Sequence, residues 1–387
     1  MRDGFSVYDT DTHISPSAEE LADYLSPRLH ELVPNLEEHL YEVRIGYAGE
    51  INEPPFRHRY RFANAVAGWG SSEPRVLGEA EPRKQERHFQ RFMGTRLPGE
   101  GGHELVKVRL KDMDEEGVDV HMLVPDPANG AENPEIEYEM LAAQHRWIDD
   151  VTKAAPHRLK SLIVVSSRSI DWSVKEIHRY GSSHWAVGVQ VYMPLDYPID
   201  HPDLAPIFLA AQEEGLAIVH HSFATGYPGY RDMWNNPFLG RSASHPWAAA
   251  RFVGAIIGSG MFDTYPDLRF GVLESGFGWL PHWAVRLDDQ LIYVGYCNEN
   301  LKYKPSEYIK SGRFFCSIEM HEGPEMVKMF TEILGNDILT FGTDYPHAES
   351  RFPDSVDRVL GWRDSGVSED ANRKMMWDNA VRFFGQP

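Results

Sequence analysis

The sequence predicts a closed α/β barrel, and three observations lead to this prediction. Short apolar runs that are typical of strands alternate with helical segments of roughly 10 to 15 residues, which favours βαβ units and a parallel sheet. About eight such strand and helix pairs can be counted, the number that a closed barrel needs. The 387 residues are long for an ordinary domain but suit a barrel with insertions, so we predict a single domain over residues 1–387.

Each element is bounded by a local signal. Gly215 follows a helical segment as a C-cap glycine would, and Ser368 with the acidic residues after it is typical of a capped helix start. The strands are expected at residues 5–8, 118–124, 162–165, 186–192, 216–220, 269–273, 313–318 and 338–341, and the helices at 138–155, 172–180, 204–214, 244–261, 279–294, 324–334 and 368–384.

Residues 35–105 break this alternation. They carry a mixed arginine and aromatic run from Arg57 to Phe62, then Trp69, and a glycine-rich stretch at 99–102. We interpret them as an insertion that forms a lid over the active site or an interface with a second subunit, and a solvated surface excursion is the alternative.

The composition of the chain argues against several classes of partner and of protein. A formal net charge of −20 disfavours nucleic acid and anionic membranes as general partners. The two cysteines, Cys297 and Cys316, are too few for a disulfide framework and lack the spacing of a thiolate zinc site. No apolar run approaches the roughly 18 residues of a membrane span, and the start has no signal core, so a cytoplasmic protein is expected.

Polar residues with metal-binding chemistry follow several of the expected strands. In Asp11-Thr12-His13, residues two apart on an extended strand point to the same side, so a carboxylate oxygen and an imidazole nitrogen can converge on one cation. Alone, this triplet also suits a helix cap beside a packed histidine. Its position on the first strand, in a chain with three further sites of this kind, favours the metal.

The middle of the chain offers two adjacent histidines. His220 and His221 face opposite ways on a strand, so at most one is expected to reach the mouth of the barrel. Counting from Gly215 favours His221 as the ligand, with His220 as the main alternative.

Two carboxylates end later strands. Asp344, in the sequence Phe-Gly-Thr-Asp-Tyr-Pro-His, could bind the ion or accept a proton from water on it and return that proton to a leaving group. His347, three residues on, is expected to support Asp344 rather than to bind the ion. Glu274 could be a further oxygen ligand, a general base, or a cap of the helix that begins near Trp279.

These motifs resemble the amidohydrolase superfamily, specifically the amidohydrolase-related branch that includes aminocarboxymuconate semialdehyde decarboxylase. The resemblance covers the chain outside residues 35–105 and includes the pattern from Gly276 to Pro281. It implies a distorted (β/α)8 barrel, often dimeric, with one divalent ion, usually zinc or manganese. The implied metal ligands are Asp11, His13, His221 and Asp344.

The chain departs from the family at one important place. Many family decarboxylases carry a histidine where this chain has Glu274, and the family's opening triplet often begins with His or Glu instead of Asp11. An ionised Glu274 would repel a substrate carboxylate placed beside it. This argument favours hydrolysis, in which a metal-activated water is deprotonated by Asp344 or Glu274 and attacks a polarised carbon.

Two other functions remain open. The first is non-oxidative decarboxylation of an aromatic or conjugated acid, in which the ion chelates a carboxylate with a neighbouring oxygen and protonated Asp344 delivers a proton to the ring carbon. The second is a barrel without catalysis that binds a ligand.

The expected partners are a small molecule and a second copy of the chain, in a homodimer. Aromatic and arginine side chains in the loops near the barrel mouth suit a small, acidic, aromatic substrate, although the aromatic residues could equally form a dimer interface. His245 could face the pocket or cap a helix. The expected substrate contacts are Arg231, Trp234, His245 and Phe277, and His220 joins Asp344 and Glu274 as a candidate catalytic residue.

Overall fold

Eight parallel strands form one sheet in the order β1-β4-β5-β6-β7-β8-β9-β10. The structure is a computed structural model that describes residues 1–45, 57–62, 93–96, 106–125, 133–193, 198–221, 237–295, 301–347 and 349–387. Each strand follows its predecessor around the sheet, as expected when helices connect parallel neighbours. The strands are β1 (Tyr8–Ile14), β4 (Val120–Pro125), β5 (Leu159–Ser166), β6 (Ala186–Tyr192), β7 (Ala217–His221), β8 (Phe270–Leu273), β9 (Phe314–Ser317) and β10 (Leu339–Thr340).

The two ends of the sheet meet. Thr10 N donates to Phe341 O at 2.9 Å, and Asp344 N donates to Asp11 O at 2.9 Å. His13 N donates to Tyr345 O at 2.6 Å. The segment after β10 thus pairs with β1, and the prediction of a (β/α)8 barrel is confirmed.

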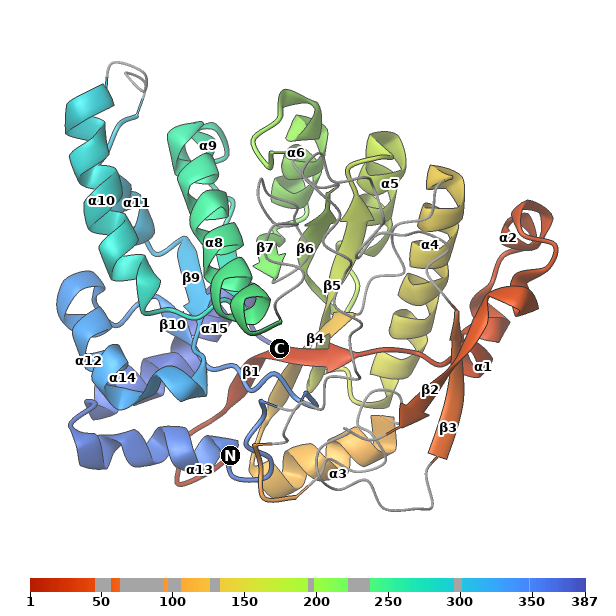
Figure 1. Ribbon diagram of the computed structural model, residues 1–387, viewed down its shortest axis with the longest axis horizontal. Helices are drawn as coiled ribbons and strands as arrows, with labels where there is room; N and C mark the ends of the chain where they lie inside the picture. The colour runs from red at the N-terminus through yellow and green to blue at the C-terminus, as the bar shows by residue number, and fades with distance from the viewer. Residues whose placement is uncertain are drawn as a thin grey trace, which may run out of the picture.

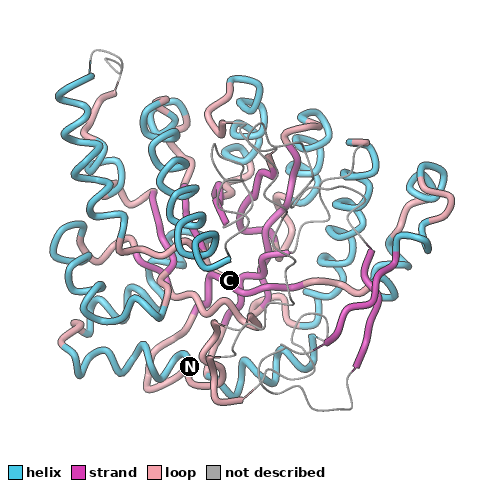
Figure 2. The backbone as a smooth tube through the Cα atoms, viewed as in Figure 1, coloured by secondary structure: helices cyan, strands magenta, loops and turns pink. Residues whose placement is uncertain are grey.

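Helices surround the strands, which gather in the middle of the molecule (Figures 1 and 2). Four helices match the expected ranges to within two residues at each end, α5 (Ile170–Tyr180), α6 (Ala205–Glu213), α10 (Trp279–Val294) and α12 (Gly323–Leu334). The other α-helices of the described residues are α1 (Ala18–Leu21), α2 (Pro27–Leu32), α3 (Val106–Glu116), α4 (Pro134–Val151), α8 (Pro237–Gly258), α9 (Met261–Thr264), α11 (Pro305–Ile309), α13 (Ser355–Leu360), α14 (Glu369–Arg373) and α15 (Asn379–Phe384).

The first strand differs from its prediction. It begins at Tyr8 instead of ending there, and it contains the whole polar segment from Asp9 to His13 in buried positions. Polar residues can occupy a buried strand here because their backbone groups pair with β4 and with the segment after β10.

The barrel is plugged at the end where its strands begin. Phe383 and Phe384 of α15 belong to the same buried cluster as Tyr8, Val120 and Ala217, the first residues of β1, β4 and β7. A second, larger apolar cluster lies between strands and helices. Because the end of the barrel where the strands begin is filled by side chains, the open end is the one that holds the carboxyl ends of the strands, where barrel enzymes place their active sites.

The range 35–105 contains a hairpin-like pair that the sequence did not predict. Strands β2 (Leu40–Ile45) and β3 (Arg57–Phe62) pair antiparallel as a separate sheet, beside α1 at the right of Figure 1. Trp69 lies outside the described residues, and the lid or interface role of this range stays a prediction. No helix within the described parts of the chain has the length and apolar character that a membrane span requires.

Candidate metal centre

Five buried side chains converge from the carboxyl ends of four strands. Asp11 and His13 belong to β1, His221 ends β7, Glu274 follows β8, and Asp344 follows β10. Segments far apart in the sequence therefore meet at one place, as the polar residues at strand ends predicted.

The first group joins β1 to β7. Asp11 Oδ1 lies 3.2 Å from His221 Nε2 and 3.9 Å from His13 Nε2. The rings of His13 and His221 meet edge to face, with centroids 4.9 Å apart. These three side chains offer one oxygen and two nitrogen atoms that could hold a single metal ion.

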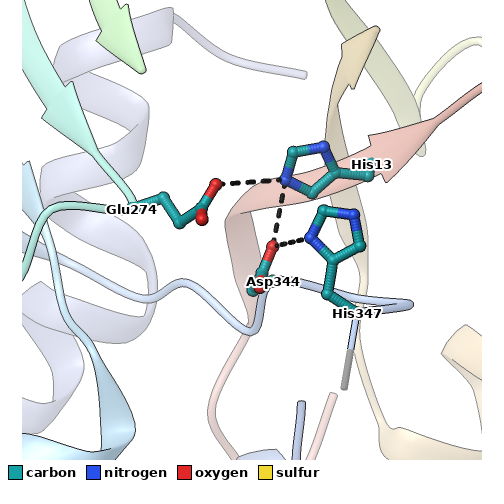
Figure 3. A group of neighbouring side chains, drawn as sticks. All are labelled: His13, Glu274, Asp344 and His347. Carbon is teal, nitrogen blue, oxygen red and sulfur yellow. Dashed lines mark hydrogen bonds and ion pairs between the residues drawn. The ribbon is translucent and has the colours of Figure 1, made fainter. Parts of the chain in front are cut away.

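The second group adds the carboxylates of the later strands. Glu274 Oε2 lies 3.1 Å from His221 Nε2 and 3.6 Å from His13 Nε2, and Asp344 Oδ1 lies 3.0 Å from His13 Nε2 (Figure 3). His347 Nδ1 is 2.6 Å from Asp344 Oδ1, the contact expected of a residue that orients this carboxylate.

The two later carboxylates have unusual backbone conformations. Glu274 has a φ of 47° and Asp344 a φ of 59°, both in the left-handed region that residues other than glycine seldom adopt. Hydrogen bonds from Glu274 N to Ser317 Oγ and from Asp344 N to Asp11 O hold these turns. Strain of this kind costs about 1 to 3 kcal/mol per residue and concentrates at functional sites.

The charges of the cluster balance one another. Burial raises the pKa of Glu274, but the nearby imidazoles, with His221 foremost, outweigh it and hold the pKa well below its usual range. Burial lowers the pKa of His221, but Asp11 and Glu274 outweigh it and raise the pKa. The imidazoles thus act as the positive partners of a group of buried carboxylates.

The donor set fits a divalent cation. Imidazole nitrogen and carboxylate oxygen are the ligands that zinc and manganese take in proteins. Asp344 Oδ2 is buried and accepts no hydrogen bond from the described residues, so this oxygen is open to a ligand. Asp11, His13, His221 and Asp344 could therefore hold the ion, and Glu274 lies among them.

The other predicted site residues differ in how near they lie to the cluster. His220 faces away from the cluster, and its ring stacks on Phe252 with centroids 5.1 Å apart. His245 lies close to the cluster, with Nδ1 3.8 Å from Glu274 Oε1. Arg231 and Trp234 lie outside the described residues.

Phe277 requires a correction. The sequence suggested a loop residue that contacts substrate, but Phe277 is fully buried in the core, and its ring centroid lies 6.0 Å from that of Phe330 in α12. Glu322 accepts hydrogen bonds from Phe277 N at 2.7 Å and Gly278 N at 3.0 Å, which holds the turn after Glu274 with the ring turned inward.

Sequence reasoning missed a buried carboxylate behind the cluster. Asp9 accepts hydrogen bonds from Thr343 N at 3.1 Å, Thr343 Oγ1 at 2.5 Å and Asp11 N at 3.2 Å. It therefore ties the ligand-bearing part of β1 to the residue before Asp344. Its only signal in the sequence is its position two residues before Asp11, on the same strand.

Known decarboxylases resemble this chain. The 2-amino-3-carboxymuconate-6-semialdehyde decarboxylase of Dictyostelium discoideum is 24% identical over 72% of this chain and 76% of its own length. The structure of 5-carboxyvanillate decarboxylase from Novosphingobium aromaticivorans, complexed with manganese and 4-hydroxy-3-methoxy-5-nitrobenzoic acid, covers 99% of this chain and 97% of its own, with 19% identity and a TM-score of 0.65. A dihydroxybenzoic acid decarboxylase from Polaromonas, with bound manganese and the inhibitor 2-nitroresorcinol, covers 73% of this chain and 86% of its own, with 20% identity and a TM-score of 0.62.

These relatives overturn the expectation of hydrolysis, because all three are decarboxylases. The argument for hydrolysis assumed that an uncompensated Glu274 would repel a substrate carboxylate. In the structure, Glu274 Oε2 instead lies beside His221 and His13, so its charge is compensated within the cluster.

The family itself follows from a match along nearly the whole chain. The family model described as amidohydrolase matches residues 8–386, from the first residue of β1 to beyond α15. The match therefore includes the ends of all four strands that bring the cluster together. The chain belongs to the amidohydrolase family and is an enzyme of that superfamily.

Proposed function

We propose that this enzyme is a divalent-metal-dependent, non-oxidative decarboxylase of a small aromatic or conjugated acid. The observation that carries the proposal is the state of the Asp344 carboxyl group. Its Oδ1 atom contacts His13 and His347, whereas its buried Oδ2 atom has no hydrogen-bond partner among the described residues. Such a group can hold a proton on Oδ2 and deliver it to a substrate carbon.

Relatives and the donor set both support the proposal. The similar enzymes decarboxylate aromatic or conjugated acids, and two of the structures contain manganese. We propose Asp11, His13, His221 and Asp344 as the residues that hold the ion, with manganese or zinc as the ion. When bound, the ion would hold an acidic substrate by its oxygen atoms and draw electron density from it.

In the proposed reaction, Asp344 transfers one proton to the substrate. In the metal-free cluster, burial raises the pKa of Asp344, but His347 and His13 together outweigh it and the pKa is lowered. A substrate carboxylate beside Asp344 raises that pKa by repulsion and favours the protonated form. Asp344 then protonates the ring carbon that bears the carboxylate. The bond to the carboxylate breaks, its electron pair returns to the ring, and carbon dioxide leaves.

His347 offers a route for replacing the proton. Its Nδ1 atom lies 2.6 Å from Asp344 Oδ1, and its side chain is 27% exposed, so it joins the buried carboxyl group to solvent. We propose His245 as a substrate contact, because it is buried beside Glu274 and extends from α8 toward the same cluster.

The test is direct measurement of carbon dioxide. The purified protein, loaded with Mn²⁺, is incubated with a panel of hydroxybenzoates and, separately, with amides, esters and lactones. Release of carbon dioxide with loss of the acid supports the proposal. Hydrolysis of an amide, ester or lactone without any carbon dioxide would refute it, and a protein that takes up no metal and binds an acid without turnover would indicate a non-catalytic barrel.

A further inference from the structure

We propose that Glu274 is a fifth ligand of the metal ion, and not a general base or a free carboxylate that faces the substrate. The inference concerns the same site as the proposed function and rests on it only for the presence of a divalent ion. It assigns a role to the position at which this chain differs from many decarboxylases of its family.

The spacing of the polar atoms supports this assignment. Ligand atoms bonded to one ion at about 2.0 to 2.2 Å lie roughly 2.8 to 3.6 Å from their neighbours in octahedral or tetrahedral geometry. Glu274 Oε2 lies 3.1 Å from His221 Nε2 and 3.6 Å from His13 Nε2. These two distances match the 3.2 Å between Asp11 Oδ1 and His221 Nε2 and the 3.0 Å between Asp344 Oδ1 and His13 Nε2.

The two oxygen atoms of Glu274 have different surroundings. Oε2 lies between the two histidines, as Figure 3 shows for His13, whereas Oε1 lies 3.8 Å from His245 Nδ1 on the side of α8. A carboxylate that binds an ion through one oxygen commonly has its other oxygen held by a neighbouring donor. At 3.8 Å, the Nδ1 atom of His245 is within ion-pair distance of Oε1 but too far for a hydrogen bond, so the His245 ring is the nearby imidazole on that side of the carboxylate.

The backbone conformation at Glu274 also supports its assignment as a ligand. Glu274 directly follows β8 and adopts a φ of 47°, so the chain turns sharply at the residue that carries the carboxylate. Asp344 has the same feature, with a φ of 59°. The strain at both positions has a common explanation if each turn aims one carboxylate oxygen at the same ion.

A fifth ligand changes the chemistry of the centre. Three carboxylates and two neutral imidazoles give a divalent centre a net charge of −1, and the oxygen-rich set favours a hard ion such as Mn²⁺. A Glu274 bonded to the ion also no longer faces the substrate as a free anion, which removes the repulsion between this residue and an acidic substrate.

The experiment measures metal affinity without any substrate. Protein freed of metal by a chelator is titrated with Mn²⁺ and Zn²⁺, as wild type, Glu274→Gln and Glu319→Gln. Glu319 is the matched control: it lies just after the neighbouring strand β9, 3.8 Å from His321, and belongs to neither group of metal-binding side chains. Burial raises the pKa of Glu319, and the charges of Asp344, Asp11 and Glu274 raise it further, so this variant tests the loss of a nearby carboxyl group that is not a ligand. We expect Glu274→Gln to weaken Mn²⁺ binding at least about 100-fold and to weaken Zn²⁺ binding less, with Glu319→Gln within about threefold of wild type.

Equal Mn²⁺ affinity in wild type and Glu274→Gln would overturn the proposal. Circular dichroism checks that the variant is folded. If Glu274→Gln does not fold, a crystal structure of wild-type protein loaded with Mn²⁺ tests the proposal instead. There, a Glu274 oxygen within about 2.4 Å of the ion supports the assignment, and a separation above about 3 Å refutes it. Failure of this test leaves the carbon dioxide assay unaffected, so the two proposals can fail separately.

Discussion

Arg109 donates a hydrogen bond from Nη2 to the backbone carbonyl oxygen of His13, although the two residues are 96 positions apart in the sequence. The same guanidinium donates from Nη1 to His121 Nδ1 at 3.2 Å, and its carbon Cζ lies 4.9 Å from the centre of the Tyr345 ring. Burial and the charge of Arg109 hold the pKa of His121 well below its usual range, so the ring is neutral and its Nδ1 atom can accept from the guanidinium. One charged group on α3 therefore contacts both the strand that carries His13 and the segment that follows Asp344.

We expect Arg109→Lys to weaken metal binding although Arg109 touches no metal. Lysine keeps the charge but lacks the planar fork, so it cannot hold His13 and His121 together. Mn²⁺ affinity should fall about 10- to 100-fold, the range found when residues that orient metal ligands are changed. Titration of the metal-free variant with Mn²⁺ measures this effect.

Arg158→Lys is the control for this variant. Arg158 also holds backbone carbonyl groups, those of Asp119 and Val118, but it does so where β4 begins, at the opposite end of the barrel. It should lose stability without losing Mn²⁺ affinity. If both variants lost affinity equally, the effect would be one of stability, and Arg109 would have no special role in positioning His13.

Asp344→Asn should remove turnover while leaving the fold intact. An amide matches the shape of the carboxyl group but cannot deliver a proton, so the rate of carbon dioxide release should fall about 10²- to 10⁴-fold. Asp357→Asn is a suitable control because Asp357 forms an exposed ion pair with Arg2, whereas the side chains of the cluster are buried. Near-normal turnover of Asp344→Asn in the presence of saturating Mn²⁺ would remove Asp344 from the proton transfer.

The buried Glu116 should make stability depend on pH. Burial, aided by Asp112 and Asp354, raises the pKa of Glu116 to about 7. Because the folded pKa is raised, the folded state binds the extra proton, so this stabilising contribution is present below the unfolded pKa and is lost as pH rises through about 7. Between a pH well below the unfolded pKa of Glu116 and a pH well above its folded pKa, the free energy of unfolding of the wild type falls by on the order of 3 kcal/mol.

Urea denaturation at several values between pH 5 and pH 8, at constant saturating Mn²⁺, tests this prediction. Glu116→Gln can still accept the hydrogen bond from Ser355 N and should reduce the loss of stability at high pH. The exposed Glu332→Gln should behave as wild type. An unchanged pH slope in Glu116→Gln would show that this carboxyl group is ionised in the folded protein at low pH.

Gly271→Ala should destabilise the barrel. A Cβ atom at Gly271 of β8 would lie 2.0 Å from Cζ of Phe383. The Phe383 ring has little room to move, because it is stacked on the ring of Phe315 with centroids 4.8 Å apart. Overpacking of this kind costs about 1 to 3 kcal/mol, measurable as a lower urea midpoint. Gly258→Ala is the control, since among the described residues no atom outside its own stretch of helix backbone lies within 4 Å of its added Cβ. Equal midpoints for the two variants would contradict the prediction.

The sequence by itself predicted the alternation of strands and helices in the barrel and five of the side chains that meet at its mouth. Alternating strand and helix periodicities are local properties, so they located seven of the barrel strands, and β6 was predicted with its observed bounds, Ala186–Tyr192. The first strand was expected at residues 5–8 and instead spans Tyr8–Ile14. The twofold period of a strand also favoured His221 over His220, and it is His221 that lies beside Asp11.

Tertiary structure decided the rest, because it depends on contacts between segments far apart in the chain. The position of Glu274 between two histidines requires the neighbouring strands β7 and β8 to meet the end of β1 across the mouth of the barrel. The inward turn of Phe277 depends on Glu322, and the support of His13 depends on Arg109. Such contacts have no local period, so no pattern in the sequence could predict them, and they became visible only when folding brought the strand ends together.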